Sequence, residues 1–262
     1  MKIIVLMKQV PNTNEVKIDP KTGTLIREGV PSIINPDDKN ALEEALKIKE
    51  EKGGSVTVLT MGPPQADFAL REALAMGADE AILLTDRVFA GADTWATSLA
   101  LAKAIQKIGE YDLIFAGRQA IDGDTAQVGP EIAEHLGLPQ VTYVRKVVSL
   151  EGNKVVVERA LEDGYEVIEC QLPAVLTAIK ELNVPRYPSV NGIVDAFSEK
   201  NPQVWNAEYI GAKPEEMGLK GSPTQVRRTF SPPVKGAGKM ISGPVKEAVN
   251  SLIQELREKN II

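Results

Sequence analysis

Residues 112–128 read DLIFAGRQAIDGDTAQV, a short apolar run followed by a polar segment that contains two glycines. The apolar part, Asp112 to Ala116, is typical of a parallel strand that is buried on both faces, because aliphatic residues follow one another without alternation. The polar part leads toward a helix that we expect to end near Gly137. A strand, a glycine turn and a helix in this order form the repeating unit of an α/β sheet, so the stretch predicts that fold class.

Other parts of the chain repeat this unit. Three further apolar runs predict buried strands, at residues 2–7, 55–61 and 80–85. Amphipathic stretches between the runs predict helices: the first from Pro36 to just before Gly53, the second over residues 63–76 and the third from Asp93 onward. Strands and helices that alternate in this way predict a Rossmann-like, doubly wound, mostly parallel sheet.

The pattern changes after Gly137. Residues 141–150 and 154–161 predict two strands of a small β hairpin, and residues 172–179 predict a further strand. From about Pro185 the aliphatic runs stop, and an extended arm ends in an amphipathic helix over residues 244–259. We therefore predict an α/β domain at residues 1–184 and an arm at residues 185–262, whose helix buries its apolar stripe against another subunit.

Composition excludes several classes of protein. The 262 residues carry a net charge of -6, which argues against nucleic acid as a partner. One cysteine and one histidine leave too few ligands for a zinc or iron site. The sequence has no apolar run long enough to span a bilayer and no secretion signal, so we expect a cytoplasmic protein.

The polar segment after residue 116 is the candidate ligand site. Strand ends in an open α/β sheet form a crevice, and helix N-termini there favour anions such as phosphate. Acidic side chains at positions 122 and 124 would repel phosphate unless they point away or cap the helix. An ordinary strand-to-helix connection is an equally good interpretation from the residues alone. The segment comprises Gly117, Arg118, Gln119, Ala120, Ile121, Asp122, Gly123, Asp124, Thr125, Ala126, Gln127 and Val128.

Residues after the other predicted strands are candidates for the same crevice. They are Leu6, Asn35, Pro36, Asp37, Asp38, Met61, Asp93 and Thr94. For Asn35, and equally for Asp93 and Thr94, helix capping is the simpler alternative. Lys8 and His135 receive no role. No spacing of residues indicates a catalytic group.

Several segments together resemble the β subunits of electron-transferring flavoproteins. They include the N-terminal VLMKQVP, Asn35-Pro36 before an acidic helix, GRQAIDGDTAQVG from Gly117, VERALEDGYEVIECQLPAVLT over residues 157–177, and the LNVPRY that starts at Leu182. The resemblance covers nearly the whole chain.

The resemblance implies a heterodimer whose α subunit carries FAD and is embraced by the C-terminal arm of the β subunit. It also implies that a nucleotide is bound by Leu6, Asn35 to Asp38, Met61 and Gly117 to Val128. A loop over residues 178–199 would recognise an acyl-CoA-type or other flavin dehydrogenase, with Val190 as its apolar anchor. The implied partner contacts are Arg186, Tyr187, Val190 and Ile193.

Two subtypes of the family, and one other class, remain open. The β subunit holds either AMP or a second FAD, and in the FAD subtype electrons from NADH are bifurcated between the dehydrogenase and ferredoxin or flavodoxin. Residues 30–36 and 91–97 resemble the FAD subtype, which implies that the threonines Thr94 and Thr97 lie toward the flavin and leaves Asp93 a cofactor-binding candidate. Oxidoreductase activity would then belong to the αβ complex. The other class is a stand-alone nucleotide-binding regulator of the stress-protein type, which would explain only the first domain.

Overall fold

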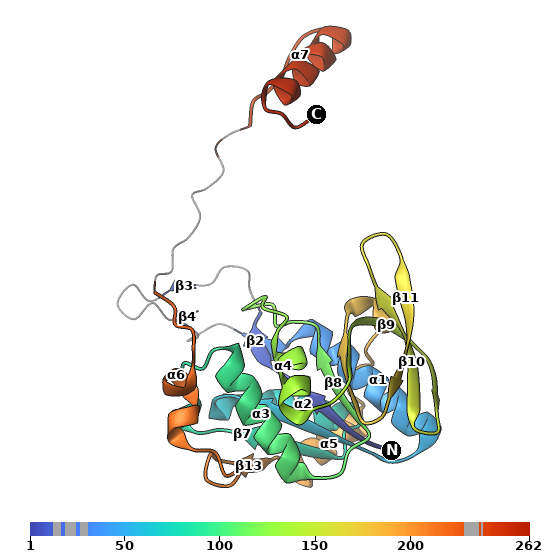
Figure 1. Ribbon diagram of the computed structural model, residues 1–262, viewed down its shortest axis with the longest axis vertical. Coiled ribbons are helices and arrows are strands. Elements are labelled where there is room, and N and C mark those ends of the chain that lie inside the picture. The colour runs from blue at the N-terminus through green and yellow to red at the C-terminus, as the bar shows by residue number, and fades with distance from the viewer. Residues whose placement is uncertain (13–16, 19–24, 27–30, 228–235, 237) are drawn as a thin grey trace. The chain divides into compact units, whose positions relative to one another are not determined.

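A computed structural model describes residues 1–12, 17–18, 25–26, 31–227, 236 and 238–262 (Figure 1). Val30, the first residue of the motif over residues 30–36, lies outside the described residues. The chain forms two compact units, Met1–Val226 and Arg227–Ile262.

The first unit is built on a nine-stranded sheet in the order β11-β10-β9-β12-β8-β1-β6-β7-β13. All neighbours from β9 to β13 are parallel, whereas β10 is antiparallel to both β9 and β11. The strands are β1 (Lys2–Leu6), β6 (Ser55–Met61), β7 (Glu80–Leu84), β8 (Leu113–Gly117), β9 (Gln140–Glu151), β10 (Lys154–Ala160), β11 (Tyr165–Gln171), β12 (Ala174–Ala178) and β13 (Gln203–Trp205). Two small antiparallel pairs accompany the sheet: β2 (Gln9–Pro11) with β5 (Ser32–Ile34), and β3 (Lys17–Ile18) with β4 (Leu25–Ile26).

Helices cover both faces of this sheet (Figure 1). The helices of this unit are α1 (Pro36–Lys52), α2 (Asp67–Met76), α3 (Thr94–Ile108), α4 (Val128–Leu136), α5 (Val190–Ser198) and α6 (Gly218–Gly221). Short 3-10 turns are η1 (Pro64–Ala66), η2 (Arg87–Phe89), η3 (Lys180–Leu182) and η4 (Pro214–Glu216). Alternate residues of β1 divide between two buried clusters: Ile3 and Val5 pack with α1 and α2, while Ile4 and Leu6 pack with α3 and α4. Strand β1 is thus buried on both faces, which confirms the interpretation of its aliphatic run.

The order of the strands creates a topological switch point. From β1 the chain moves outward through β6 and β7, and β8 then returns to the opposite side of β1. The segments that leave β1 and β8 therefore run in opposite directions, and a crevice forms between the carboxyl ends of the two strands. This architecture confirms the doubly wound, mostly parallel α/β sheet expected from the sequence.

The first unit continues beyond residue 184, where the sequence suggested that the domain ends. Strand β13 pairs with β7, and Trp205 is buried. Helix α5 and strand β11 were also not expected as separate elements. Their signals are weak because β13 has only three residues, α5 buries only Ala196, and β11 exposes most of its side chains.

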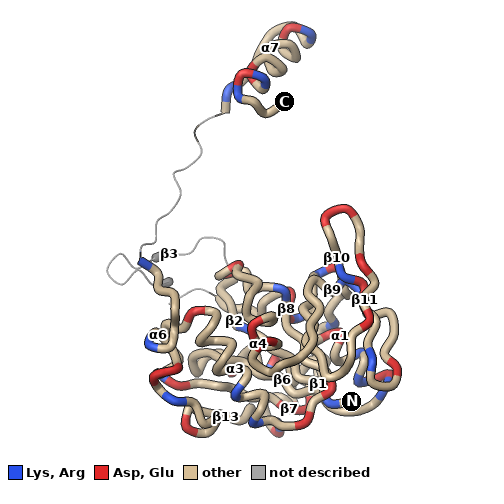
Figure 2. Tube along the Cα trace, in the orientation of Figure 1, with Lys and Arg blue, Asp and Glu red and all other residues tan. Residues whose placement is uncertain are grey.

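The second unit contains one helix among its described residues, α7 (Val245–Glu258), close to the predicted residues 244–259. It is amphipathic, and its apolar residues Val245, Val249, Leu252 and Ile253 are not covered by the described residues of their own unit. Acidic and basic residues are mixed along the trace of α7 and along that of the first unit (Figure 2). Among the described residues, no helix has the length and apolar character that crossing a membrane requires.

Candidate functional site

The Asp38 carboxylate joins three segments at the switch point. Its Oδ2 accepts a hydrogen bond from Lys8 N after β1 at 2.7 Å, and its Oδ1 accepts one from Gly117 N at the end of β8 at 3.0 Å. Asp38 itself lies in the first turn of α1. A Cβ atom on Gly117 would lie 2.2 Å from Asp38 Oδ1, so the glycine is required by the approach of α1. Gly117 belongs to the candidate ligand segment, but the close contact at this glycine is with Asp38 of the same chain.

Burial strongly affects this carboxyl group. Asp38 is inaccessible apart from a small fraction of its surface, and burial raises its pKa to about 7. Hydrogen bonds from Asn35 and from the amides of Lys8 and Gly117 oppose that shift, since they favour the charged form. Burial also raises the pKa of the neighbouring Asp37, against the attraction of Arg118, whose Nε lies 3.6 Å from Asp37 Oδ2.

Asn35 binds the loop after β8. It occupies the N-cap position of α1, but its side chain makes no capping hydrogen bond, so the capping interpretation was wrong. Instead its Nδ2 donates to Gln119 O at 2.8 Å, and its Oδ1 accepts from Ile121 N at 3.1 Å. Because Asn35 is fully buried, these bonds fix the first half of the loop to α1.

The two acidic residues of the loop have partners within the protein. Asp122 Oδ1 lies 2.6 Å from Lys8 Nζ, and Asp124 Oδ1 accepts from Gln119 Nε2 at 2.8 Å. Neither residue caps α4. The repulsion between these carboxylates and a phosphate is therefore reduced, because one carboxylate is paired with a cation and the other with an amide donor. Lys8, which received no role from the sequence, is the residue that neutralises Asp122.

The second half of the loop has the backbone geometry of an anion site. Asp124 and Ala126 have φ angles of 50° and 53°, in the left-handed region that residues other than glycine rarely adopt. Gln127 is right-handed, and α4 begins at the next residue. Successive residues of opposite handedness point their amides into one concavity, and a helix N-terminus adds a positive dipole end. Within the described part of the chain, no protein group accepts hydrogen bonds from the amides of Ala126 and Gln127.

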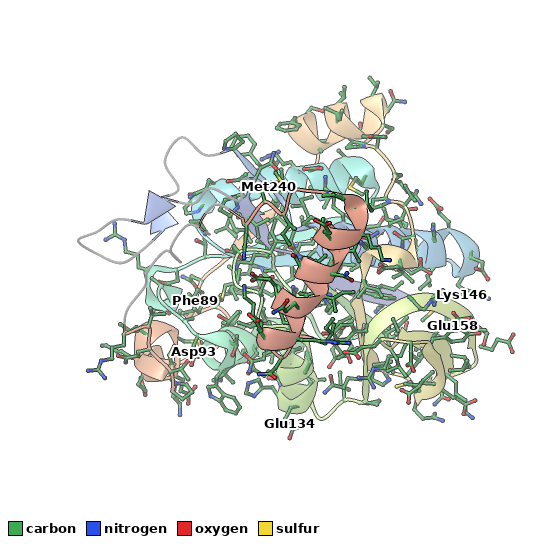
Figure 3. All side chains as sticks on the ribbon, turned by 90° about the horizontal axis from the view of Figure 1, so that it is seen from above. Phe89, Asp93, Glu134, Lys146, Glu158 and Met240 are labelled. Atoms are coloured by element: carbon green, nitrogen blue, oxygen red, sulfur yellow. The ribbon has the colours of Figure 1, made fainter. Side chains whose placement is uncertain are left out.

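The start of α3 lies beside the start of α4. Asp93 caps α3 through Ala96 N at 3.0 Å, so the capping interpretation is confirmed, and its Oδ2 accepts from Thr224 N and Oγ1. Figure 3 labels Asp93 at the start of α3 and Phe89 in the preceding turn η2. Burial acts to raise the pKa of Asp93, but these hydrogen bonds outweigh it and hold the pKa below its usual value. Thr94 Oγ1 donates to Glu131 Oε1 at 3.0 Å and lies 3.5 Å from Gln127 Oε1.

The remaining candidates divide into two groups. Leu6 and Met61 end β1 and β6, and Thr97 lies in the first turn of α3, so all three are at the crevice edge of the sheet. The proposed partner residues are elsewhere: Tyr187 and Val190 are exposed, whereas Arg186 points toward α1.

Three contributors to the site were missed or misread in the sequence. Lys8 binds Asp122, and Glu131 accepts a hydrogen bond from Thr94. In both pairs the partner is distant in the sequence, so no local spacing predicts the contact. Gly129 had a local signal, since it follows the loop directly. A Cβ atom there would lie 2.7 Å from Thr177 Cγ2, so this glycine lets the first turn of α4 approach β12.

The fold and the crevice define the class of this protein: a Rossmann-like, doubly wound α/β domain whose loop after β8 has the form of an anion-binding turn. Comparisons with known proteins identify the family more closely. A family model described as the electron transfer flavoprotein domain matches residues 22–208.

Three relatives illustrate the similarity. An electron transfer flavoprotein subunit beta of Thermoanaerobacterium thermosaccharolyticum is 64% identical over 262 residues and covers all of both chains. The subunit CarD of the caffeyl-CoA reductase-Etf complex of Acetobacterium woodii is 63% identical over 264 residues, again over the whole of both chains. Protein FixA of Azorhizobium caulinodans is 49% identical over 241 residues, which are 88% of this chain and 85% of its own. This chain belongs to the electron transfer flavoprotein family, as a β subunit.

The substitution Asp38→Asn tests the two hydrogen bonds that the Asp38 carboxylate accepts from Lys8 N and Gly117 N. An asparagine offers one acceptor oxygen to two amide donors, so one buried N–H is left without a partner at a cost of about 1–3 kcal/mol in the free energy of unfolding. Urea unfolding of the subunit within its natural complex measures this loss. The matched control is Asp37→Asn, which removes only a long ion pair with Arg118 worth about 0–1 kcal/mol. Equal losses in the two variants would contradict the special role of Asp38.

Proposed function

We propose that this β subunit pairs with an α subunit and holds an adenine nucleotide in the crevice between β1 and β8. The observation that carries the proposal is the left-handed Ala126 followed by the N-terminus of α4, with amides that have no acceptor among the described residues. In this arrangement the amides of residues 126–128 hold the phosphates. Lys8 and Gln119 hold the two loop carboxylates in internal bonds, so that an anion is tolerated nearby.

The same geometry favours a ligand longer than a mononucleotide. Thr94 extends the polar surface from Gln127 and Glu131 of α4 to the first turn of α3, where Thr97 lies. We therefore propose FAD as the β-site ligand, with its flavin end toward Asp93, Thr94 and Thr97. AMP, bound at the phosphate turn alone, is the second candidate.

FAD supplies the redox chemistry when it is bound, and the protein supplies position and electrostatics. We assign to the αβ pair the oxidation of NADH, with bifurcation of its electrons between an acyl-CoA-type dehydrogenase and ferredoxin or flavodoxin. The dehydrogenase assignment is supported by relatives that are named as parts of acyl-CoA reductases: the caffeyl-CoA complex subunit above and, at 49% identity, an acryloyl-CoA reductase electron transfer subunit gamma. The α subunit carries the other FAD of the αβ pair.

Two exposed apolar surfaces suit the proposed partners. Helix α5 is capped by Ser189 and exposes Val190, Ile193, Val194 and Phe197 on one side, which we assign to the dehydrogenase. Helix α7 carries an apolar stripe that its own unit leaves uncovered, and we assign this stripe to the α subunit. A stand-alone regulator would have no use for either surface.

Extraction of nucleotides from the purified αβ pair tests the ligand. We expect two FAD molecules per pair and no AMP, measured by separating the released nucleotides after denaturation. A content of one FAD and one AMP per pair would show that AMP is the β-site ligand. That result would also contradict the proposed bifurcation. A pair without any nucleotide at the β site would overturn the crevice assignment.

Val190→Asp tests the dehydrogenase surface. The substitution places a charge in an apolar contact, so we expect the KM for a purified acyl-CoA dehydrogenase to rise at least about tenfold, while the nucleotide content of the pair stays constant. Val204→Asp is the control, because Val204 is similarly exposed but lies on β13. If both variants keep the wild-type KM, α5 is not the contact surface.

A further inference from the structure

Arg186 is bound to α1 by an unusually complete set of contacts. Its Nε donates to Glu43 Oε2 at 2.9 Å and its Nη2 to Glu43 Oε1 at 3.2 Å. The same guanidinium donates to both carboxylate oxygens of Glu50, two turns further along α1. The backbone amide of Arg186 also donates to Glu43 Oε2, at 3.0 Å. We call Arg186, Glu43 and Glu50 the Arg186 clamp.

The side chains of the Arg186 clamp are partly buried. The Glu43 side chain is 5% exposed and that of Arg186 is 32% exposed. The hydrogen bonds that Arg186 donates to Glu50 and Glu43 raise the pKa of Arg186, and the bond that Glu50 accepts from Arg186 lowers the pKa of Glu50. Buried ion pairs often add little net stability, because desolvation offsets the attraction between the charges. Their planar, bidentate geometry does fix orientation, and only arginine provides it.

A second polar contact holds the same segment three residues earlier. Asn183 Nδ2 donates to Asn40 O and to Glu44 Oε2, both at 3.0 Å, and Asn40 Nδ2 donates to Asn183 O at 2.8 Å. Residues 183–186 are therefore attached to one side of α1 by backbone and side-chain bonds together.

This segment leads directly into α5. Tyr187 is 94% exposed, and the helix begins after Ser189. The inner side of α5 buries only Ala196, and Gly192 allows its backbone to approach α2, because a Cβ atom would lie 2.2 Å from Ala75 O. With so little apolar surface buried, hydrophobic packing alone fixes the helix weakly.

Polar contacts also hold the far end of α5. Arg71 Nη1 donates to Ala196 O at 2.6 Å, and its guanidinium lies 5.3 Å from the centre of the Phe197 ring. Lys200 Nζ donates to Ala78 O at 3.1 Å, just after the helix. Helix α5 is thus held at both ends by polar groups, while its apolar side faces outward.

We propose that the Arg186 clamp positions α5 for the partner dehydrogenase, and that Arg186 is a positioning residue rather than a contact residue. The inference rests on the proposed role of α5 as the partner surface. It replaces the interpretation of Arg186 as a partner contact, since its guanidinium is already engaged by two carboxylates of its own chain. Because α1 also carries Asp38, one rigid helix supports both the nucleotide crevice and the partner surface.

Arg186→Lys, studied in the αβ pair, tests the clamp. Lysine keeps the charge but cannot bind two carboxylates in a bidentate manner. We expect the KM for a purified acyl-CoA dehydrogenase to rise about five- to tenfold, with kcat at saturation and nucleotide content unchanged. Hydrogen exchange of the amides in residues 189–198 should accelerate, while that of α1 stays constant. Arg87→Lys, at an exposed arginine of η2, is the control and should change none of these quantities.

Two further variants make the outcomes distinguishable. Glu50→Gln removes only the exposed half of the clamp, so it should shift KM and exchange in the same direction by less, and it serves if Arg186→Lys does not fold. Wild-type KM and exchange in both variants would overturn the clamp, as would a parallel loss of nucleotide. Val190→Asp separates the two proposals: if it leaves KM unchanged, the partner surface is misassigned, whereas the exchange rates of residues 189–198 still decide whether the clamp fixes α5.

Discussion

The structure depends on one buried carboxylate. Asp38 connects the amides that follow β1 and end β8, and it does so from the first turn of α1. Because those two strands are neighbours at the switch point, this tie fixes both the width of the crevice and the direction in which the next loop leaves. The same hydrogen bonds require glycine at position 117, since any side chain on Gly117 would displace the Asp38 carboxylate. Burial of the group raises its pKa, and the amide donors are what keep the charged form tolerable.

The loop after β8 takes its electrostatic character from this arrangement. Asn35 fixes the first half, Lys8 and Gln119 engage the two acidic side chains, and the second half is free to direct its amides outward. The strained backbone at Asp124 and Ala126 costs on the order of 1–3 kcal/mol for each residue, and such strain tends to occur at functional positions. A loop with two acidic residues can therefore still suit an anion, because Lys8 from another segment neutralises Asp122 and Gln119 of the loop itself binds Asp124.

The difference between local signals and contacts of distant segments explains which features the sequence predicts. Central strands and the helices α1, α3 and α7 were predictable, because runs of aliphatic residues and caps are local signals. The pair of Lys8 and Asp122 joins residues 114 positions apart, so no local pattern indicates it. Asn35 was misread for the same reason: a capping residue and a loop-binding residue look alike until the fold brings Gln119 to it. Helix α5 was hidden because it buries only Ala196, and the contacts of Arg186 with α1 were hidden because their partners lie over 130 residues earlier.

Helix α1 is the common support, since its first turn shapes the crevice and its middle holds the segment before α5. We propose that the turn formed by Ala126, Gln127 and Val128 holds the phosphates of an adenine nucleotide. A high-resolution experimental structure of the αβ pair with its bound nucleotide measures this directly. We expect phosphate oxygens within about 3 Å of these backbone amides, the distance of an N–H to O hydrogen bond. A nucleotide whose phosphates lie elsewhere, with the amides facing water, would contradict it.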